Sequence, residues 1–583
     1  MVAGVTRALL AAFALLLPAA GATAAGAACE VAWHFTPMAA GSTRYIDAEV
    51  TWQAGDTVTT ELVLTPDWGG VELTPLRRDF RTRSSHQWVL DRADPARKTV
   101  THLPHERISV RYRIDARPPE PEHDAIARRD VYSAIVGADW FHFTGYAALV
   151  VPAQYGDDSR ARLCVTIDSR EGDDWILSSL GARRARSATF ALRDSPDRVR
   201  HAIYFGGRFD VRERSVHGRS LWIARHGPWR FGMDRYADLA AELIATQRSF
   251  WGDFDFPPLV IELLHTNQPA GPSGGTALHN ALVLYAPDNL EVPGEQFEFL
   301  LAHEHLHTWI PRRFGAMGEN EALRYWFSEG FTDFYTHRLL VRGGTWTLDR
   351  YAAALNRKIE QYLQANLPAY DNARVGAEFF ADPAIGLLPY SRGELLALRW
   401  QQALAAQRGD GLDDVMKSLL LPRGLEADAR TPLPLATGRL LEAVSVVVPD
   451  ARADVDRYVE RGESMAFDAQ SLGPCFTMRV EDKPRFALGF DRRSVREGRL
   501  TGVDVEGPAY AAGLRDGQPI SGFYLYEGDV SKDASVLLRD DDGRTTAEVS
   551  FRPVAADRRS IPVYAPAFGA AAAPECRAWF GMP

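Results

Sequence analysis

The sequence predicts a multidomain protein with an N-terminal all-β, sandwich-like domain, a central α+β domain and a C-terminal β-rich domain. At 583 residues the chain exceeds the length of one ordinary domain. Short β-branched segments give way near residue 231 to long helical patterns, and short strands return after residue 471. The expected units are a leader at 1–28, followed by domains at 29–230, 231–470 and 471–583.

The composition is typical of a globular protein and excludes some classes of partner. Apolar residues make up 46% and charged residues 24% of the chain, so sizeable cores can form. The formal net charge of −10 argues against a general nucleic-acid binder. No long Lys/Arg run suggests binding to an anionic membrane surface.

The first 28 residues have the pattern of a secretory signal peptide. Arg7 precedes an apolar run at 8–17, and small residues at 19–28 offer several cleavage sites. The run is short for a membrane span, so none is expected in the mature chain. A lipoprotein anchor through Cys29 is the less favoured alternative, because Gly26 stands where a large aliphatic residue is usual. We expect an exported protein, either periplasmic or secreted.

The four cysteines fit export, since an even number in an exported chain suggests disulfides. Cys29 and Cys164 bracket the first third of the chain, whereas Cys475 and Cys576 bracket the last hundred or so residues. Sequence alone allows three pairings. We favour Cys29–Cys164 and Cys475–Cys576, because each bond would stay within one domain.

Short segments rich in β-branched residues predict the N-terminal domain, and turn-forming Gly, Pro and Asp separate them. These segments are Thr59–Leu64, Ile108–Ile114, Ala147–Val151 and Leu163–Ile167. A β-sandwich is the expected form.

In the central domain, strands alternate with helices before a long helical region. Strands are expected at Leu259–Leu264 and Ala281–Tyr285, separated by a Gly-rich turn at 271–275. A helix is expected at 295–309, and helical patterns continue to about residue 463.

The expected helix at 295–309 carries an H-E-x-x-H motif. His303 and His307 lie four residues apart on one face and can hold one zinc ion, with Glu304 near its open side. A single histidine is more often a hydrogen-bonded core residue, but the spacing and the accompanying Glu304 weaken that alternative. His305 faces elsewhere, so we expect it to be structural or solvent-facing.

A second segment, Tyr325–Tyr335, is expected to be an amphipathic helix that supplies the third ligand. Glu329 sits among aromatic residues, where an unpaired carboxylate is costly to bury and a cation removes that cost. Asp333 lies one turn further on and is placed to accept a hydrogen bond from a zinc-bound histidine, His303 being favoured. The alternative is that the two carboxylates form a solvated acidic face.

These motifs resemble the gluzincin metallopeptidases, and specifically the M61 glycyl aminopeptidase family. That family combines an initial β-rich domain, H-E-x-x-H on one helix, W-F-S-E-G-F-T on the next and a PDZ domain near the C-terminus; residues 326–332 match the second motif throughout. The resemblance implies a thermolysin-like α+β zinc peptidase fold for the central domain. It implies one Zn²⁺ ion held by His303, His307 and Glu329, with Glu304 as general base.

The resemblance also implies a role for Tyr390, within Pro389-Tyr390-Ser391-Arg392-Gly393. In related gluzincins a tyrosine before x-[KR]-G points its hydroxyl at the oxyanion formed during attack. A core tyrosine at the start of a helix is the alternative.

The expected substrate is a peptide or protein, extended along the strand Ala281–Tyr285 as an edge strand. Gly274, Gly275 and Asn280 are the candidate substrate contacts. In family members the Gly-Gly pair is followed by Leu-Glu-His, and that glutamate suits a free α-amine; here Ala277 takes its place. An aminopeptidase is the leading expectation. An endopeptidase or an altered exopeptidase stays open, unless another acid such as Glu319 or Glu321 takes over.

Near the C-terminus, 486–490 and 507–517 resemble the carboxylate-binding loop of a PDZ domain and its short helix. Leu488, Gly489 and Phe490 are therefore candidates for binding a C-terminal peptide ligand through backbone amides. A purely structural module is the alternative. For the whole chain, a catalytically inactive PDZ-bearing binding protein is a further alternative, disfavoured because all four residues of the metal centre are present.

Overall fold

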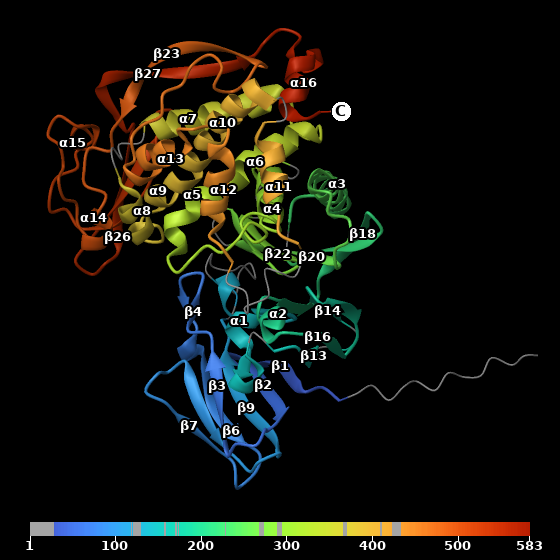
Figure 1. Cartoon of the computed structure of the whole chain (residues 1–583). Coiled ribbons are helices and arrows are strands. Elements are labelled where there is room, and N and C mark those ends of the chain that lie inside the picture. Colours follow the sequence, from blue (N-terminus) through green and yellow to red (C-terminus); the bar gives the residue numbers. More distant parts are fainter. Residues whose placement is uncertain are drawn as a thin grey trace, which may run out of the picture.

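The computed structural model describes residues 28–582 except 118, 120–129, 157–158, 170–171, 173, 228, 267–272, 288–293, 365–369, 409–410 and 423–432 (Figure 1). The expected signal peptide lies, apart from Ala28, outside the described residues. Among the helices of the described part, none is long and apolar enough to cross a bilayer.

Three large sheets and the two-stranded pair β4 (Asp67–Trp68) and β5 (Val71–Glu72) build the N-terminal domain, which confirms the β-rich prediction (Figure 1). A six-stranded sheet runs β16 (Ser187–Asp194), β13 (Ala161–Asp168), β1 (Val31–Ala40), β2 (Thr43–Gln53), β9 (Arg107–Asp115), β6 (Arg77–Thr82). A four-stranded sheet runs β12 (Val150–Pro152), β3 (Thr59–Leu64), β8 (Arg97–Thr101), β7 (Trp88–Asp91). A five-stranded sheet runs β10 (Ile135–Val136), β11 (Trp140–Thr144), β17 (Ile203–Gly207), β14 (Trp175–Ser178), β15 (Gly181–Arg184).

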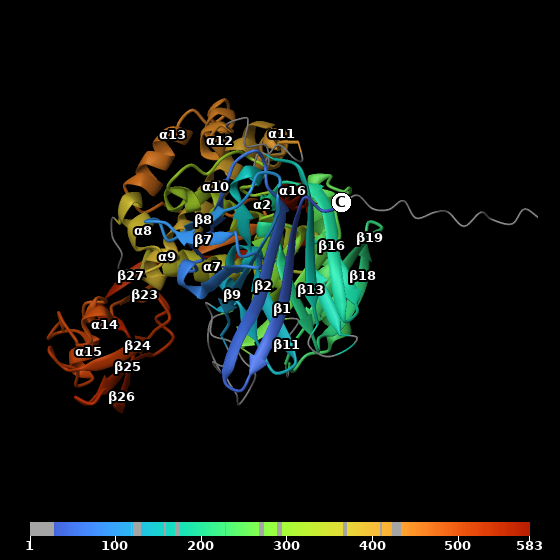
Figure 2. The ribbon, with the colours of Figure 1, turned by 90° about the horizontal axis from the view of Figure 1, so that it is seen from below.

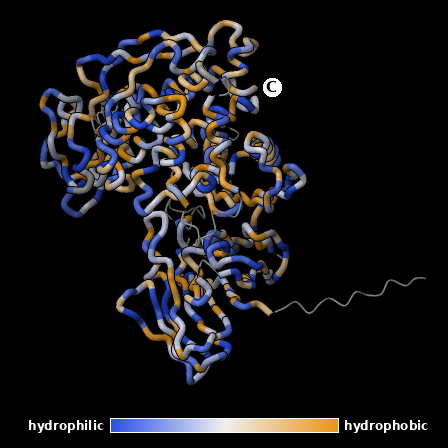
Figure 3. Tube along the Cα trace, in the orientation of Figure 1, coloured by the Kyte–Doolittle hydropathy of each residue, from blue (hydrophilic) through white to orange (hydrophobic). Residues whose placement is uncertain are grey.

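Side chains from all three sheets share one buried core, which includes Trp33, Leu62 and Phe141. Buried and more exposed residues alternate along β1, because successive side chains of a strand point to opposite faces. Figure 3 shows hydrophilic and hydrophobic residues interspersed through this domain. The segment expected as a strand at Ala147–Val151 is divided between helix α1 (Gly145–Ala148) and β12. Thr144 begins that helix by accepting a hydrogen bond from the backbone N–H of Ala147.

The central domain contains a five-stranded sheet in the order β18 (Asp210–Val216), β19 (Arg219–Arg225), β20 (Leu259–Thr266), β22 (Ala281–Pro287), β21 (Gly274–Leu278). Strands β19, β20 and β22 are parallel, and β18 and β21 are the antiparallel edges. By hydrogen bonding, residues 210–225 therefore join the central sheet, although the sequence pattern put them before a boundary at 230.

The sheet order corrects the expected edge strand. β22 lies between β20 and β21, so β21 is the edge, and Gly274 and Gly275 lie in that strand rather than in a turn. Sequence periodicity could not decide this, because both segments are short and only hydrogen-bond pairing separates an inner from an outer strand.

Helices cover the sheet and form the largest core of the molecule (Figure 1). The principal ones are α3 (Met233–Trp251), α4 (Glu295–Leu306), α5 (Tyr325–Ser328), α6 (Gly330–Arg342), α7 (Leu348–Gln364), α10 (Leu388–Arg408), α11 (Leu412–Leu419) and α12 (Ala436–Ser445). The helix expected at 295–309 ends three residues earlier, at Leu306. The helix expected at Tyr325–Tyr335 is divided into α5 and α6 at Glu329.

Helices α6 and α10 meet through two glycines. A Cβ atom built on Gly393 would lie 1.7 Å from the carbonyl oxygen of Trp326, and one on Gly330 would lie 2.4 Å from Gly393 Cα. The two backbones therefore touch directly. This contact brings Tyr390, one turn before Gly393, beside Glu329, which immediately precedes Gly330.

The C-terminal region consists of a long strand pair with a small domain inserted between its strands. β23 (Phe476–Phe486) pairs antiparallel with β27 (Val554–Pro566), and the pair lies on α7. Residues 487–553 form a separate core with β24 (Ile520–Tyr524), β25 (Ala534–Arg539), β26 (Thr545–Phe551), α14 (Ser494–Glu497) and α15 (Pro508–Ala511). Figure 2 shows this small domain to one side of the main body. The prediction of a C-terminal β-rich domain is confirmed.

Both favoured disulfide pairings are confirmed: Cys29 bonds Cys164, and Cys475 bonds Cys576. The second bond joins the start of β23 to α16 (Pro574–Phe580) inside the main core. Phe476, Tyr564 and Trp579 lie in the same core. The ends of the expected C-terminal unit, on either side of residues 487–553, therefore belong to the central domain.

Candidate metal centre

Three candidate ligand atoms, two from the C-terminal end of α4 and one from the junction of α5 and α6, converge on one point. His303 Nε2 lies 3.2 Å from His307 Nε2 and 3.3 Å from Glu329 Oε2, and His307 Nε2 lies 3.5 Å from Glu329 Oε2. A tetrahedral zinc ion bound at its usual distances holds its donors about 3.3–3.4 Å apart. The donors therefore fit Zn²⁺, and they form the one such group among the residues that the structure describes.

Backbone geometry explains how each ligand reaches that point. His303 lies on α4, and His307 follows its last residue with helical dihedrals (φ −62°, ψ −10°), which keeps both imidazoles on one face. Glu329 sits between α5 and α6, also in the helical region (φ −92°, ψ −46°). Its side chain turns toward the histidines, so the solvated acidic face considered from the sequence does not form.

A hydrogen bond on the far ring nitrogen orients each histidine. His303 Nδ1 donates to Asp333 Oδ1 at 2.8 Å, and His307 Nδ1 donates to the carbonyl of Ile310 at 2.9 Å. These bonds direct both Nε2 atoms toward the metal position, as outer partners of zinc ligands do. Asp333 therefore lies where the sequence analysis expected it, beside His303. The motif gave no indication that the carbonyl of Ile310 would bond His307.

The charges around the three ligands favour a cation. Burial lowers the pKa of His303, but hydrogen bonds to Asp333 and Glu329 outweigh burial and raise it to about 10. Burial raises the pKa of Glu329, but the neighbouring histidines hold it well below the ordinary range of a glutamate. An ionised carboxylate among nitrogen donors gives the mixed donor set that zinc accepts.

Glu304 lies between the metal ligands and the edge strand β21. Its side chain is buried, and a Cβ atom on Gly275 would lie 2.7 Å from Glu304 Cγ. Burial raises the pKa of Glu304, and the nearby His307 and His303 lower it only in part. Gly275 therefore lets β21 run directly against the carboxylate, and any larger residue would displace that side chain.

Tyr390 lies near the start of α10, with its ring 6.0 Å from that of His303. Burial raises the pKa of its hydroxyl well above 10, and the charges of Glu329, Asp333 and Glu304 raise it further. The hydroxyl therefore stays protonated and can donate a hydrogen bond at neutral pH.

Tyr390→Phe is expected to lower kcat on the order of 100-fold with little change in KM, because the hydroxyl would act only in the transition state. The measurement is steady-state hydrolysis of an alanyl or glycyl chromogenic amide at constant zinc content. Tyr362→Phe is the matched control, since that hydroxyl bonds the backbone of Glu463 and Met465 instead. An unchanged kcat in Tyr390→Phe would remove the residue from catalysis.

The other candidate substrate residues are not all close to the metal. Gly274 neighbours Gly275 in β21, and a Cβ there would meet the hydroxyl of Tyr285 at 2.3 Å. Asn280 lies in the β21–β22 turn with φ +52°, and its carbonyl accepts a hydrogen bond from the backbone of Val260. Asparagine tolerates the left-handed conformation of this turn, so its presence at position 280 does not require contact with a substrate.

His305 lies away from the metal position. It is fully buried, and its Nδ1 lies 2.5 Å from Gln247 Oε1. Burial holds its pKa well below 6.5, so the ring is neutral. The residue is structural rather than solvent-facing.

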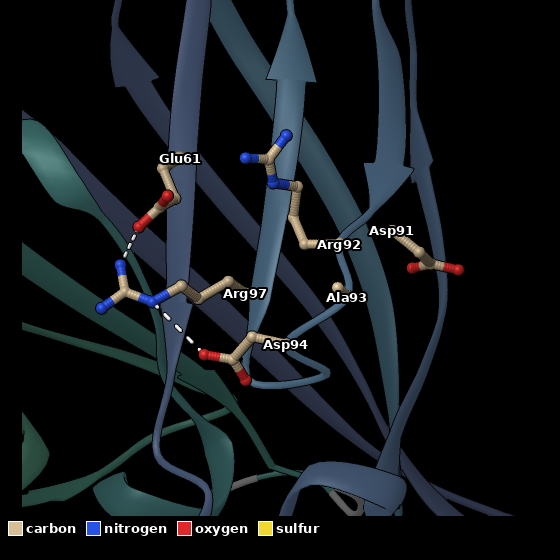
Figure 4. A pocket seen from close by; sticks show the side chains of 6 residues that line it. All are labelled: Glu61, Asp91, Arg92, Ala93, Asp94 and Arg97. Carbon is tan, nitrogen blue, oxygen red and sulfur yellow. Dashed lines mark hydrogen bonds and ion pairs between the residues drawn. The ribbon is translucent and has the colours of Figure 1, made fainter.

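A charged pocket in the N-terminal domain, of about 390 Å³, is separate from this centre (Figure 4). It is lined by Glu61, Asp91, Arg92, Ala93, Asp94 and Arg97. Arg97 pairs with both Glu61 and Asp94 across it. These ion pairs account for the charges, and the pocket holds no candidate nucleophile or metal group.

Comparisons with known proteins agree with this geometry. No curated relative matches the sequence significantly. An aminopeptidase N family protein from Idiomarina loihiensis is similar in structure, with a TM-score of 0.68 and 16% identity over 95% of this chain and 100% of that one. An M1 zinc metallopeptidase from Deinococcus radiodurans matches with a TM-score of 0.46 and 16% identity over 75% and 94% of the two chains. The second TM-score lies below 0.5, so only the first likeness supports an argument, and at 16% identity it shows a common fold alone.

The family comparison covers the metal centre itself. Residues 296–373 match the family model of the M61 glycyl aminopeptidases. This segment contains His303, Glu304, His307, Glu329 and Asp333, and it stops before Tyr390. The family resemblance read from the sequence is therefore confirmed over this segment: the residues that build the candidate metal centre are similar to those of the M61 glycyl aminopeptidases.

Proposed function

We propose that the protein is an exported zinc metallopeptidase of the aminopeptidase type, with one Zn²⁺ ion held by His303, His307 and Glu329. The observation that carries this proposal is the convergence of three ligand atoms within 3.5 Å of one another, with Glu304 beside them. Asp333 and the carbonyl of Ile310 bond the far ring nitrogen of each histidine, which leaves both Nε2 atoms directed toward Glu329.

The roles of the residues follow from their positions. A zinc ion bound at this site would act as a Lewis acid that activates water and polarises a carbonyl. Glu304 accepts the proton of the attacking water and passes it to the leaving amine, a role that suits a carboxylate of raised pKa. Tyr390 donates its hydroxyl proton in a hydrogen bond to the tetrahedral oxyanion.

The edge strand β21 is the proposed docking strand for the peptide. One side of β21 pairs with β22, and its other side pairs with no strand among the described residues. An extended peptide added there forms backbone hydrogen bonds that do not depend on its sequence. Gly275 brings the same strand against Glu304, so the docked peptide bond passes close to the proposed base.

An endopeptidase or altered exopeptidase is the second candidate, and one contact favours it. Ala277 of β21 offers no carboxylate, and its carbonyl oxygen accepts a hydrogen bond from Arg312 Nη2 at 2.5 Å. A guanidinium at that position does not attract a substrate ammonium group. Glu321 is the acid that could compensate, because it lies within reach of the charge of Glu329; burial and then that charge raise its pKa and favour its neutral form until a cation binds.

Cleavage of a peptide library with free and acetylated N-termini, together with the zinc content of the protein, tests these functions. Cleavage that needs a free N-terminus supports the aminopeptidase. Equal cleavage of acetylated peptides supports the endopeptidase. Bound zinc without hydrolysis of any peptide supports an inactive binding protein, and a chain that takes up no zinc contradicts the proposal.

For the small domain we propose a PDZ-like module whose loop at Leu488, Gly489 and Phe490 binds a C-terminal carboxylate. Gly489 has φ +81°, and a Cβ there would lie 3.0 Å from the backbone of Ala509 on α15, so the loop lies on that helix. Residues 520–551, all described, contain strands and no helix to form a second groove wall. A purely structural module is therefore the competing reading, and the absence of fluorescence-detected binding of C-terminal peptides would favour it.

Export is proposed on two grounds. The leader has the pattern of a signal peptide, and the two disulfides require an oxidising compartment to persist. Periplasmic and secreted locations both satisfy this condition.

A further inference from the structure

A buried lysine joins two carboxylates behind the metal centre. Lys358, on α7, donates through Nζ to Asp333 Oδ2 and to Glu394 Oε2. The second oxygen of each carboxylate holds a histidine: Asp333 Oδ1 bonds His303 at 2.8 Å, and Glu394 Oε1 bonds His337 at 2.6 Å. Both carboxylates are at least 95% buried. All four carboxylate oxygens thus accept a hydrogen bond, and the ammonium group of Lys358 lies between the two carboxylates.

The two sides of α7 have different tasks. Lys358 lies two residues from Asn356 and from Glu360, which places it about 200° around the helix from each. Asn356 bonds both backbone groups of Tyr564 in β27, at 2.7 and 2.8 Å, and Glu360 pairs with Lys483 of β23 at 2.6 Å. The strand pair therefore holds one side of α7, while the other side presents Lys358 to the metal centre.

The bond to Lys358 restricts how Asp333 can turn. A carboxylate held by one oxygen alone can rotate about its Cβ–Cγ bond, whereas one held by both oxygens has a defined plane. With Oδ2 fixed on Lys358, Oδ1 stays on His303 Nδ1. Outer partners of zinc ligands act in this way, by fixing the ring orientation and the tautomer of the histidine.

We propose that Lys358 is a positioning residue of the metal centre, which holds the plane of Asp333 and through it the orientation of His303. Glu394 and His337 complete the arrangement by holding Lys358 from the opposite side. The proposal rests on the proposed zinc function. It extends the metal centre onto α7 and α10, beyond the helices that carry the ligands.

The sign of the electrostatic effect makes the proposal testable. Loss of a positive charge near the site by itself strengthens the binding of a cation. Loss of a positioning contact weakens it, typically 10- to 100-fold for an outer partner of a zinc ligand. If a variant without the Lys358 charge binds zinc more weakly, the cause is therefore the loss of the positioning contact, because the loss of the charge alone would have the opposite effect.

The experiment measures zinc affinity of Lys358→Met by chelator competition on the metal-stripped full chain, together with its melting temperature. We expect zinc to bind roughly 10- to 100-fold more weakly. Asn356→Ala is the matched control on the opposite side of α7: it loses two hydrogen bonds to Tyr564, so its melting temperature falls while its zinc affinity stays unchanged.

The double variant K358M/E394Q removes one of the two buried carboxylate charges. It is expected to fold at least as well as Lys358→Met and still to bind zinc weakly.

Unchanged or tighter zinc binding in either Lys358 variant, with only a lower melting temperature, would overturn the proposal and leave Lys358 as a structural ion pair. A failure of the proposed function gives a different result, because the parent chain itself would then take up no zinc.

Discussion

Replacing Glu304 by glutamine is expected to lower peptide hydrolysis by roughly 100- to 10,000-fold while the protein keeps its zinc. Glutamine has nearly the same shape, so the packing against Gly275 and the three ligands stay in place. It cannot accept the proton of the attacking water. The measurement combines kcat/KM on a chromogenic amide with the zinc content of the purified variant.

Glu295→Gln is the matched control for Glu304→Gln, because Glu295 begins the same helix α4 and pairs there with Arg357. Its kcat/KM should equal that of the parent chain. Hydrolysis retained by Glu304→Gln would rule out this carboxylate as the base. Loss of zinc would instead show that Glu304 supports the ligands.

The pH dependence of kcat/KM is expected to carry the signature of the same carboxylate. Burial raises the pKa of Glu304 above the ordinary range of a glutamate. The base works only when ionised, so activity is present above this raised pKa and is lost as the pH falls through it. A pH–rate profile measured with zinc in excess should therefore show an acid limb. A rate that does not fall toward low pH would contradict the role of this carboxylate.

Gly393→Ala is expected to destabilise the protein by about 3 kcal/mol and to impair the active site as well. The added methyl group would lie 1.7 Å from the carbonyl oxygen of Trp326, which is backbone and cannot turn away as a side chain can. Helix α10 must then move away from α5 and the start of α6, so Tyr390 moves away from Glu329. The melting temperature should fall by roughly 6–12 °C.

Gly438→Ala provides the control for a glycine in a helix. Gly438 lies in α12, and a Cβ there would approach no atom closer than 3.9 Å, that of Leu435. Alanine has the higher helix propensity, so this variant should keep or raise the melting temperature. Equal melting temperatures for Gly393→Ala and the parent chain would contradict direct backbone contact between α6 and α10.

The candidate metal ligands could be predicted because their pattern is local. One helix turn relates His303 to His307. The cost of burying Glu329 among aromatic residues can be recognised from its neighbours in the sequence alone. The disulfide pairing also followed from position along the chain, and the structure confirms it. Local periodicity likewise separated the β-rich N-terminal domain from the helical centre.

The remaining features depend on contacts between segments far apart in the sequence. The sequence by itself predicted the candidate metal ligands and the order of the β-rich and helical regions, and it favoured one of three possible cysteine pairings. Only the tertiary structure decided that β21 is the edge strand, that Gly330 meets Gly393 and that Lys358 holds Asp333. The physical reason is that helix periodicity and burial cost are properties of adjacent residues. Strand order, backbone contact between helices and ion pairing depend on which distant segments the fold brings together.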